Sequence, residues 1–197
     1  MNYLDAGNMK YQFIESEITY DGTQLSPHWI YRHFDLPGNA MVAFIGGCDV
    51  SLDHMVDLAD VKNQDPIYSP RMLHFIGEFF EGDLERMILW QRLLMVIIRE
   101  ELEERGIPGR IIRRGDDLYH SGVAGVVRKL SVSIATSSVT SNLIHIGINI
   151  QTGGVPVPAV GLGELSIEPE GFACSVLKRF HREYEQVGIA RCKVRGV

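Results

Sequence analysis

The amino-acid sequence predicts an α+β fold in which helices back a mixed, largely antiparallel sheet. Several short apolar runs have the length of strands, two longer segments have helical periodicity, and the two kinds of segment do not alternate strictly. The 197 residues, 45% of them hydrophobic and 22% charged, suffice for a buried core without disulfides or metals. We expect one domain spanning residues 1–197.

The strands are predicted from apolar runs bounded by glycine, proline or polar clusters. The first run ends at the pair Gly46 and Gly47, and a Gly-Asp-Asp turn follows the third. Residues 151–163 contain four glycines and two prolines and are predicted to be a loop. The predicted strands are residues 40–45, 71–80, 110–114, 126–136 and 143–150, and the tail from residue 188 is a candidate edge strand.

Two helices are predicted, over residues 84–105 and 170–186. Asp83 is suited to cap the first helix, and Gly106 with Pro108 ends it. The stripe expected to be buried on the first helix comprises Leu84, Ile88, Met95, Ile98 and Leu102. The corresponding face of the second comprises Phe172, Val176, Phe180, Tyr184 and Val187.

Composition narrows the class of protein. The net charge of −6 disfavours a nucleic-acid interface, which is usually basic. Three widely spaced cysteines favour a reducing compartment. Residues 1–13 lack a signal-peptide core, and the longest aliphatic run, residues 93–98, is too short to cross a membrane. We therefore expect a cytoplasmic protein with no membrane partner.

The strands at 126–136 and 143–150 carry the strongest functional signal. Lys129, Ser131 and Ser133 alternate with bulky apolar residues on the first strand. The second alternates isoleucines with His145, Gly147 and Asn149. Pairing Ser133 with His145, Ser131 with Gly147 and Lys129 with Asn149 would unite both small polar faces into the floor of a ligand pocket. The alternative is an ordinary solvated sheet face.

Residues 113–150 resemble the signature of biotin protein ligases. The chain reads Arg-Arg-Gly-Asp-Asp-Leu-Tyr, then Arg-Lys-Leu-Ser-Val-Ser-Ile and Ile-His-Ile-Gly-Ile-Asn-Ile. The family reads Lys-Trp-Pro-Asn-Asp-Leu-Tyr, then Lys-Lys-Leu-Ala-Gly-Ile-Leu and Gly-Ile-Gly-Ile-Asn-Val. The resemblance implies the fold shared by biotin ligases, lipoate ligases and the class II aminoacyl-tRNA synthetase core. It also implies that Asp117 is the motif aspartate and Lys129 the lysine that contacts the carboxylate and the adenylate phosphate.

The whole chain also resembles a prokaryotic family, a domain of unknown function, that is grouped by fold with biotin and lipoate ligases. One segment departs from the ligase pattern. Where biotin ligases have a Gly-Arg-Gly-Arg-Arg-Gly loop over the adenylate, this chain has Gly46, Gly47 and then Cys-Asp-Val-Ser-Leu-Asp-His. Phosphates need backbone N–H groups and positive charge, so ATP is only weakly supported as a cofactor.

Other residues are candidates with simpler alternatives. Cys48 is a candidate nucleophile for thioester transfer. If Lys129 lies opposite it, the ammonium would lower the pKa of the thiol. The alternative is that Cys48 is a buried small hydrophobe. Asp116 and Asp117 are candidates to hold an amine or hydroxyl, or are turn residues. Arg114 is a candidate carboxylate or phosphate ligand, or a solvated strand end.

A possible metal cluster and two histidines complete the set of candidates. The spacing of the possible ligands matches no strong metal motif, and we predict no metal. These residues are Cys48, Asp49, Asp53, His54 and Asp57. His74 is expected to be a core residue, whereas His145 is equally suited to core and pocket.

Two hypotheses follow for function. The first is an enzyme that activates or transfers a small-molecule carboxylate, with Lys129, Asp117 and Cys48 as catalytic candidates and an acceptor protein as a candidate partner. Its substrate-binding residues would be Arg114, Asp116, Ser131, Ser133, His145, Gly147, Asn149, Gly46 and Gly47. The second is a non-catalytic metabolite-binding module of the same fold. A homodimer paired through sheet edges is expected in either case.

Overall fold

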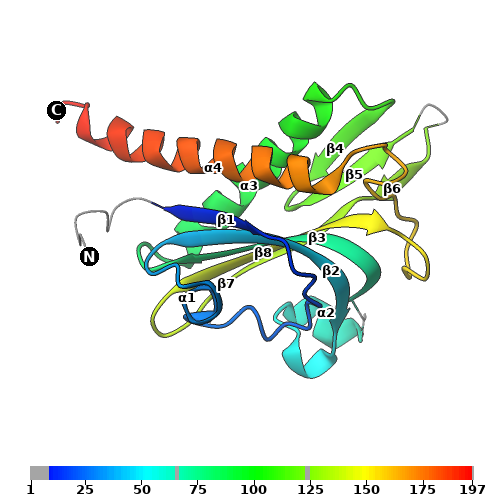
Figure 1. The fold of residues 1–197 in the computed structure, drawn as a ribbon, viewed down its shortest axis with the longest axis horizontal. Coiled ribbons are helices and arrows are strands. Elements are labelled where there is room, and N and C mark those ends of the chain that lie inside the picture. Colours follow the sequence, from blue (N-terminus) through cyan, green and yellow to red (C-terminus); the bar gives the residue numbers. More distant parts are fainter. Residues whose placement is uncertain (1–8, 65–66, 123–124, 197) are drawn as a thin grey trace.

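The computed structural model of the protein describes residues 9–64, 67–122 and 125–196. The described chain forms two sheets (Figure 1). The larger sheet has the strand order β1-β2-β3-β8-β7 and the smaller sheet the order β4-β5-β6. Only β1 runs parallel to its neighbour; all other pairs in the described chain are antiparallel. The strands of the larger sheet are β1 (Lys10–Ile14), β2 (Ala40–Val50), β3 (Ile67–Phe79), β8 (Asn142–Gln151) and β7 (Ser131–Ser137). Those of the smaller sheet are β4 (Arg110–Arg114), β5 (Asp117–Ser121) and β6 (Val127–Lys129).

Helices cover both faces of the larger sheet (Figure 1). The long helices α3 (Leu84–Glu104) and α4 (Pro169–Cys192) lie on one face. The short helices α1 (Trp29–Phe34) and α2 (Leu58–Asn63) lie on the other. The predicted α+β class with a mixed, largely antiparallel sheet is therefore confirmed.

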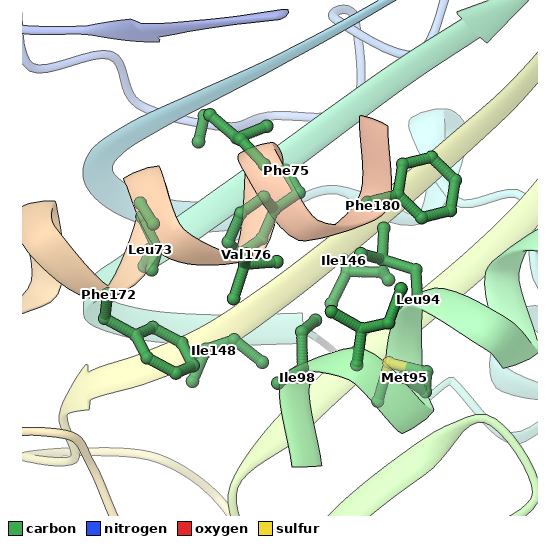
Figure 2. Close-up of a cluster of buried hydrophobic side chains, with 14 of the residues drawn as sticks. Leu73, Phe75, Leu94, Met95, Ile98, Ile146, Ile148, Phe172, Val176 and Phe180 are labelled. Carbon is green, nitrogen blue, oxygen red and sulfur yellow. The ribbon is translucent and has the colours of Figure 1, made fainter. Parts of the chain in front are cut away.

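The main core lies between the sheet and the two long helices (Figure 2). Alternate residues of β3 and β8 point towards the helices, as strand geometry requires. They meet apolar side chains from both helices, among them Leu73, Phe75, Ile146, Ile148, Leu94, Ile98, Phe172, Val176 and Phe180. A second apolar cluster lies on the opposite face, where Trp29 and Ile30 of α1 pack against Phe44 and Ile76.

The helices begin where predicted but differ in their buried faces and ends. The Asp83 side chain accepts a hydrogen bond from the Arg86 N–H, which confirms it as the cap of α3. The predicted burial of Leu84 and Ile88 is wrong, because in the first turns of α3 Met87 and Trp90 face the core and leave Leu84 and Ile88 exposed. The predicted edge strand from residue 188 is also wrong, since α4 continues to Cys192.

Two strands differ from their predicted bounds in ways that affect the site. Strand β2 runs through Gly46 and Gly47 to Val50, so these glycines lie inside a strand and not in a loop. Gly46 is needed there because a Cβ would meet the Ile18 carbonyl at 1.9 Å. The strand predicted at 126–136 is divided at Leu130 into β6 and β7, which belong to different sheets.

The predicted register of β7 with β8 is wrong by one residue. Ser131 pairs with Ile148 and Ser133 with Ile146, so the serines share a sheet face with the isoleucines. Val132 pairs with Gly147 instead and packs against the second apolar cluster. The division at Leu130 causes the difference, because a one-residue shift exchanges the two faces of a strand.

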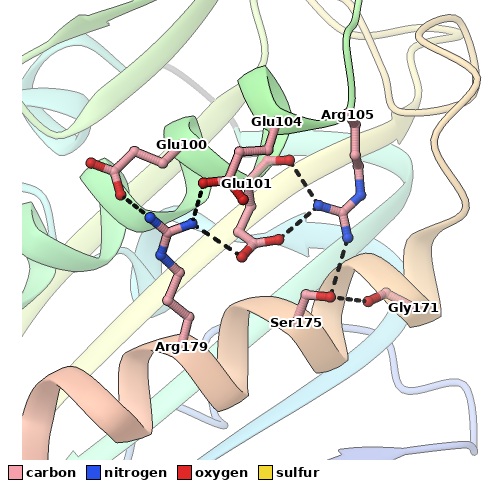
Figure 3. Close-up of polar contacts among 7 residues, drawn as sticks. All are labelled: Glu100, Glu101, Glu104, Arg105, Gly171, Ser175 and Arg179. Carbon is pink, nitrogen blue, oxygen red and sulfur yellow. Dashed lines mark hydrogen bonds and ion pairs between the residues drawn. The ribbon is translucent and has the colours of Figure 1, made fainter.

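An ion-pair network joins α3 to α4 (Figure 3). Arg179 of α4 lies 2.5 Å from Glu100, 3.3 Å from Glu101 and 2.9 Å from Glu104. Arg105 lies 2.7 Å from the other carboxylate oxygen of Glu101. The Glu101 side chain is only 11% exposed, and these two arginines are its ion-pair partners among the described residues.

Replacing Arg179 with Met should lower the free energy of unfolding by about 1–2 kcal/mol, because the mostly buried Glu101 carboxylate loses one of its two cations. Urea denaturation measures the change. The matched control is Arg182→Met, at an exposed position on the same helix. Equal stability of the two variants would contradict the assigned role.

Candidate functional site

A cavity of about 490 Å³ lies at the end of the larger sheet, between the edge strand β7, the α2 segment and the loop after β8. Its charged lining comprises Lys129, Asp57, Asp60, Asp116 and Asp117. The apolar lining comprises Val50, Met55, Val56, Ile67, Met72, Val132, Ile134, Val155, Pro156 and Val157. Tyr20 and His145 also line the cavity and are nearly inaccessible to solvent. The cavity thus suits an elongated molecule with a polar head and an apolar body.

Part of the charged lining is organised by an ion pair. Lys129 Nζ lies 2.8 Å from Asp117 Oδ2, and the two side chains are 29% and 24% exposed. Burial alone would lower the pKa of Lys129, but the hydrogen bond and charge of Asp117 raise it above its ordinary value. Lys129 therefore stays an ammonium, which carries three hydrogen-bond donors, one of them directed at Asp117.

The position of Lys129 follows from the passage of the chain between the two sheets. The Leu130 N–H donates to the Leu118 carbonyl in the smaller sheet, and the Asn149 N–H donates to the Leu130 carbonyl in the larger one. The Lys129 backbone is bonded on its other side to Pro158 and Val160. The residue is thus held by both sheets and by the loop after β8.

The two serines of β7 position the aspartate turn. Ser131 is buried, and its Oγ accepts a hydrogen bond from the Leu118 N–H at 2.8 Å. Ser133 Oγ donates to the Asp116 carbonyl at 2.7 Å and accepts from Gln91 Nε2 at 2.8 Å. Both hydroxyls therefore have structural partners beside the cavity.

Another part of the cavity wall contains a stack of rings. The Tyr20 ring lies on His145 with centroids 3.7 Å apart and planes inclined by 11°. His145 Nε2 lies 3.1 Å from His74 Nδ1. Burial lowers the pKa of His74 to about 4, and burial with the neighbouring His74 lowers the pKa of His145 well below its ordinary value. Both imidazoles are therefore neutral near pH 7.

The cavity gathers most, but not all, of the residues expected from sequence. The expected residues that line the cavity are Lys129, Asp116, Asp117, Ser131, Ser133, His145 and Asn149. Gly147 lies under Met72 and Val132 and is absent from the lining, as are Gly46 and Gly47 of β2. The Arg114 guanidinium lies over the Tyr119 ring on the smaller sheet, outside the cavity.

For Cys48 the structure favours the alternative of a buried small hydrophobe over an activated thiol. Cys48 is 1% exposed and does not line the cavity. Burial, with a smaller contribution from Asp49, raises the pKa of its thiol to about 12. A buried thiol of this kind packs as a small hydrophobe. Among the described residues, no group of three or more His, Cys, Asp or Glu side chains could hold a metal ion.

Sequence reasoning missed three parts of the wall. Tyr20 reaches the cavity because residues 18–20 pair alongside β2, with the Tyr20 N–H bonded to the Gly47 carbonyl. Asp60 lies on α2 and is close enough to Lys129 to raise its pKa. Val155, Pro156 and Val157 lie in a loop that was predicted only as a connection. No local pattern marks these residues, because they reach the cavity only through long-range contacts.

The model of one family, the domain of unknown function DUF366, matches residues 9–195. The chain belongs to this family. Uncharacterized protein MJ0805 of Methanocaldococcus jannaschii is 35% identical over 170 residues, which cover 83% of this chain and 74% of that protein. A solved protein of unknown function from Pyrococcus horikoshi is 40% identical with a TM-score of 0.89, covering 96% of this chain and 100% of that one.

More distant structures are ligases. A biotin protein ligase from Aquifex aeolicus, solved with biotin and ATP, has a TM-score of 0.59 at 15% identity. The match covers 89% of this chain and 71% of the ligase chain. A bipartite lipoate protein ligase from Thermoplasma acidophilum has a TM-score of 0.54 at 13% identity. That match covers 91% of this chain and 84% of the other chain. At this identity the similarity establishes the fold and not the activity. No helix in the described part of the chain is long and apolar enough to cross a membrane.

Thiol alkylation should distinguish the three cysteines. Cys174 and Cys192 are exposed, so iodoacetamide should modify them at least about 100-fold faster than Cys48, whose thiolate fraction and access are both small. Mass spectrometry of native protein over time gives the rates, and the urea-unfolded chain provides the control. Fast native labelling of Cys48 would restore it as a candidate nucleophile.

Proposed function

We propose that this protein binds a small carboxylic acid, or its acyl derivative, in the cavity at Lys129 and transfers the acyl group. The observation that carries this proposal is the Lys129–Asp117 ion pair in the wall of a cavity that is lined by both polar and apolar side chains. An ammonium in the cavity wall is suited to bind a carboxylate or acyl carbonyl oxygen, because it carries three hydrogen-bond donors. During attack on the carbonyl, the same group would stabilise the developing oxyanion.

The fold and the position of the motif support this assignment. The solved neighbours include ligases whose complexes contain biotin or lipoate, which are carboxylic acids with compact, partly apolar bodies. In this chain Lys129 and Asp117 are brought together by the two-sheet crossing. We transfer only the class of ligand, a small carboxylic acid, and not biotin or lipoate themselves.

The charge of the site favours an acyl group that is already activated. Lys129 is the only lysine or arginine among the described residues that line the cavity, whereas four of them are aspartates: Asp57, Asp60, Asp116 and Asp117. The triphosphate of ATP would need several cations or a bound metal in place of these acids. A thioester carries no charge at its carbonyl group, so it avoids the repulsion that a polyphosphate would meet.

The alternative function is a metabolite-binding module without turnover. It is favoured by the burial of Cys48, which removes the thiol nucleophile from the site. The two functions predict the same ligand class and differ only in chemistry. An acceptor protein and pairing of two copies through sheet edges remain parts of the proposal.

Replacing Lys129 with Met should weaken binding of octanoate or lipoate by about 10- to 100-fold, because a charge-assisted hydrogen bond contributes about 1.5–3 kcal/mol. Met keeps most of the apolar stem and removes the ammonium. Isothermal titration gives the affinities, with Lys178→Met, at an exposed position on α4, as the matched control. Equal binding by both variants would place the carboxylate elsewhere.

Turnover should follow the thioester route. An amine would attack the carbonyl carbon of an octanoyl thioester, forming the C–N bond while the C–S bond breaks and the thiol leaves with a proton. We expect thiol release above the Lys129→Met background and no pyrophosphate release from ATP with octanoate. Pyrophosphate release would instead indicate ligase-type activation, and ligand binding with neither product would indicate the binding module.

A further inference from the structure

The cavity wall carries more negative than positive charge. Lys129 is the one lysine or arginine among the described residues that line it, whereas Asp57, Asp60, Asp116 and Asp117 contribute carboxylates. With histidines counted as neutral, the wall is therefore net negative. Charges in a partly enclosed space are screened less than charges on an open surface. The imbalance therefore acts on every charged ligand that enters the cavity.

The charge of Lys129 is already compensated by the protein. Lys129 Nζ lies 2.8 Å from Asp117 Oδ2, and the two side chains are 29% and 24% exposed. The carboxylate of a ligand that binds Lys129 therefore brings a second negative charge to one ammonium. Placing two like charges beside one cation in a partly buried site is unfavourable. A cation that arrives with the ligand would restore the balance.

The aspartates of the α2 segment are placed to bind such a cation. Asp57 caps α2 and Asp60 lies three residues later, so the two lie on one side of the helix. Both are half-buried and line the cavity, whereas the intervening Leu58 and Ala59 are exposed and do not line it. Asp57 Oδ1 accepts hydrogen bonds from the Ala59 and Asp60 N–H groups, which fixes the position of this carboxylate.

Tyr20 is an independent sign that the cavity receives a polar group. The residue is 4% exposed and lines the cavity. Its hydroxyl makes no hydrogen bond within the described chain, and the oxygen is not fully enclosed. Burial raises the pKa of Tyr20, so the hydroxyl stays neutral and can accept as well as donate a hydrogen bond. Because a buried polar group without a partner is costly, a ligand with an N–H donor would stabilise this part of the wall.

We propose that the ligand of this cavity is a zwitterionic acid, whose chain carries a protonated amine in addition to its carboxylate or acyl group. This inference rests on the proposed function, because the carboxylate or acyl group of the same molecule is assigned to Lys129. The ammonium binds at the carboxylates of Asp57 and Asp60, and the apolar side chains of the wall contact the aliphatic part. The cavity thus selects an amino acid over a simple monoanionic acid by charge.

Acids of one chain length that differ in charge test the proposal. Octanoic acid, its 2-, 5- and 8-amino derivatives and the matching hydroxy acids compare an ammonium with a neutral polar group at three positions. For the position that fits best, isothermal titration should show the amino acid binding at least about tenfold more tightly than the hydroxy acid, the effect of one charge-assisted hydrogen bond. Equal affinities at all three positions, or tighter binding of the hydroxy acids, would overturn the proposal.

The double variant Asp57→Asn with Asp60→Asn removes both charges and keeps the cap, because Asn caps helices as well as Asp does. It should lose the preference for the amino acid and bind octanoate several-fold more tightly than the unmodified protein, since the repulsion is gone. A purely structural role would instead weaken binding of both ligands. If the variant did not fold, the ligand series on the unmodified protein would still decide the question.

The matched control is Asp53→Asn, at an exposed aspartate of the same segment that does not line the cavity. This variant should keep the preference for the amino acid and the affinity for octanoate. Loss of the preference in the double variant alone supports the proposal. Loss in both variants, or in neither, contradicts it.

The outcomes also separate this inference from the proposed function. If neither octanoate nor any of its derivatives binds, the carboxylate site at Lys129 is refuted and both fail. If octanoate binds in a way that Lys129→Met weakens, but the amine brings no gain, only the present inference fails. Binding of the amino acids alone supports both.

Discussion

The central constraint on this structure is that β3 and β8 are buried on both faces. Every residue from Met72 to Phe79, and from Asn142 to Ile150, is buried. Towards α3 and α4 this burial is filled by aliphatic and aromatic side chains. On the opposite face polar side chains must find partners among themselves, which they do in the pairs His74 with His145 and Ser69 with Asn149. Desolvation therefore both stabilises the sheet and fixes the polar groups of the cavity.

The second organising feature is the passage of the chain from the smaller to the larger sheet at Leu130. Main-chain hydrogen bonds hold Leu130 to both sheets, and the Ser131 hydroxyl replaces a further ladder bond by accepting the Leu118 N–H. Asp117 begins β5 and Lys129 ends β6, the neighbouring strand of the smaller sheet, and their side chains meet beside this passage as an ion pair. The position of this ion pair in the cavity wall is therefore a consequence of topology, and its geometry is as rigid as the junction itself.

The cavity combines a ligase-like fold with an electrostatic character of its own. Aspartates on α2 and at the β4–β5 turn surround the single lysine, and the segment over the cavity is a short helix that carries acids. The same backbone arrangement can therefore serve different ligands, because side chains on the covering segment decide which charges are tolerated. His145 adds a neutral polar group to the wall, because burial lowers its pKa well below the ordinary value.

Sequence alone determined the fold class, the two long helices, the Asp83 cap and the association of Lys129, Asp117 and Asn149 with one site, because periodicity, capping and a local motif are encoded within short segments. Only the tertiary structure decided four other features. These are the register of β7 with β8, the burial of Cys48, the extension of β2 through Gly46 and the contribution of Tyr20 to the cavity wall. These features depend on which distant strands pair and which groups lose water together. Such contacts join residues far apart in the chain, and no local pattern records them.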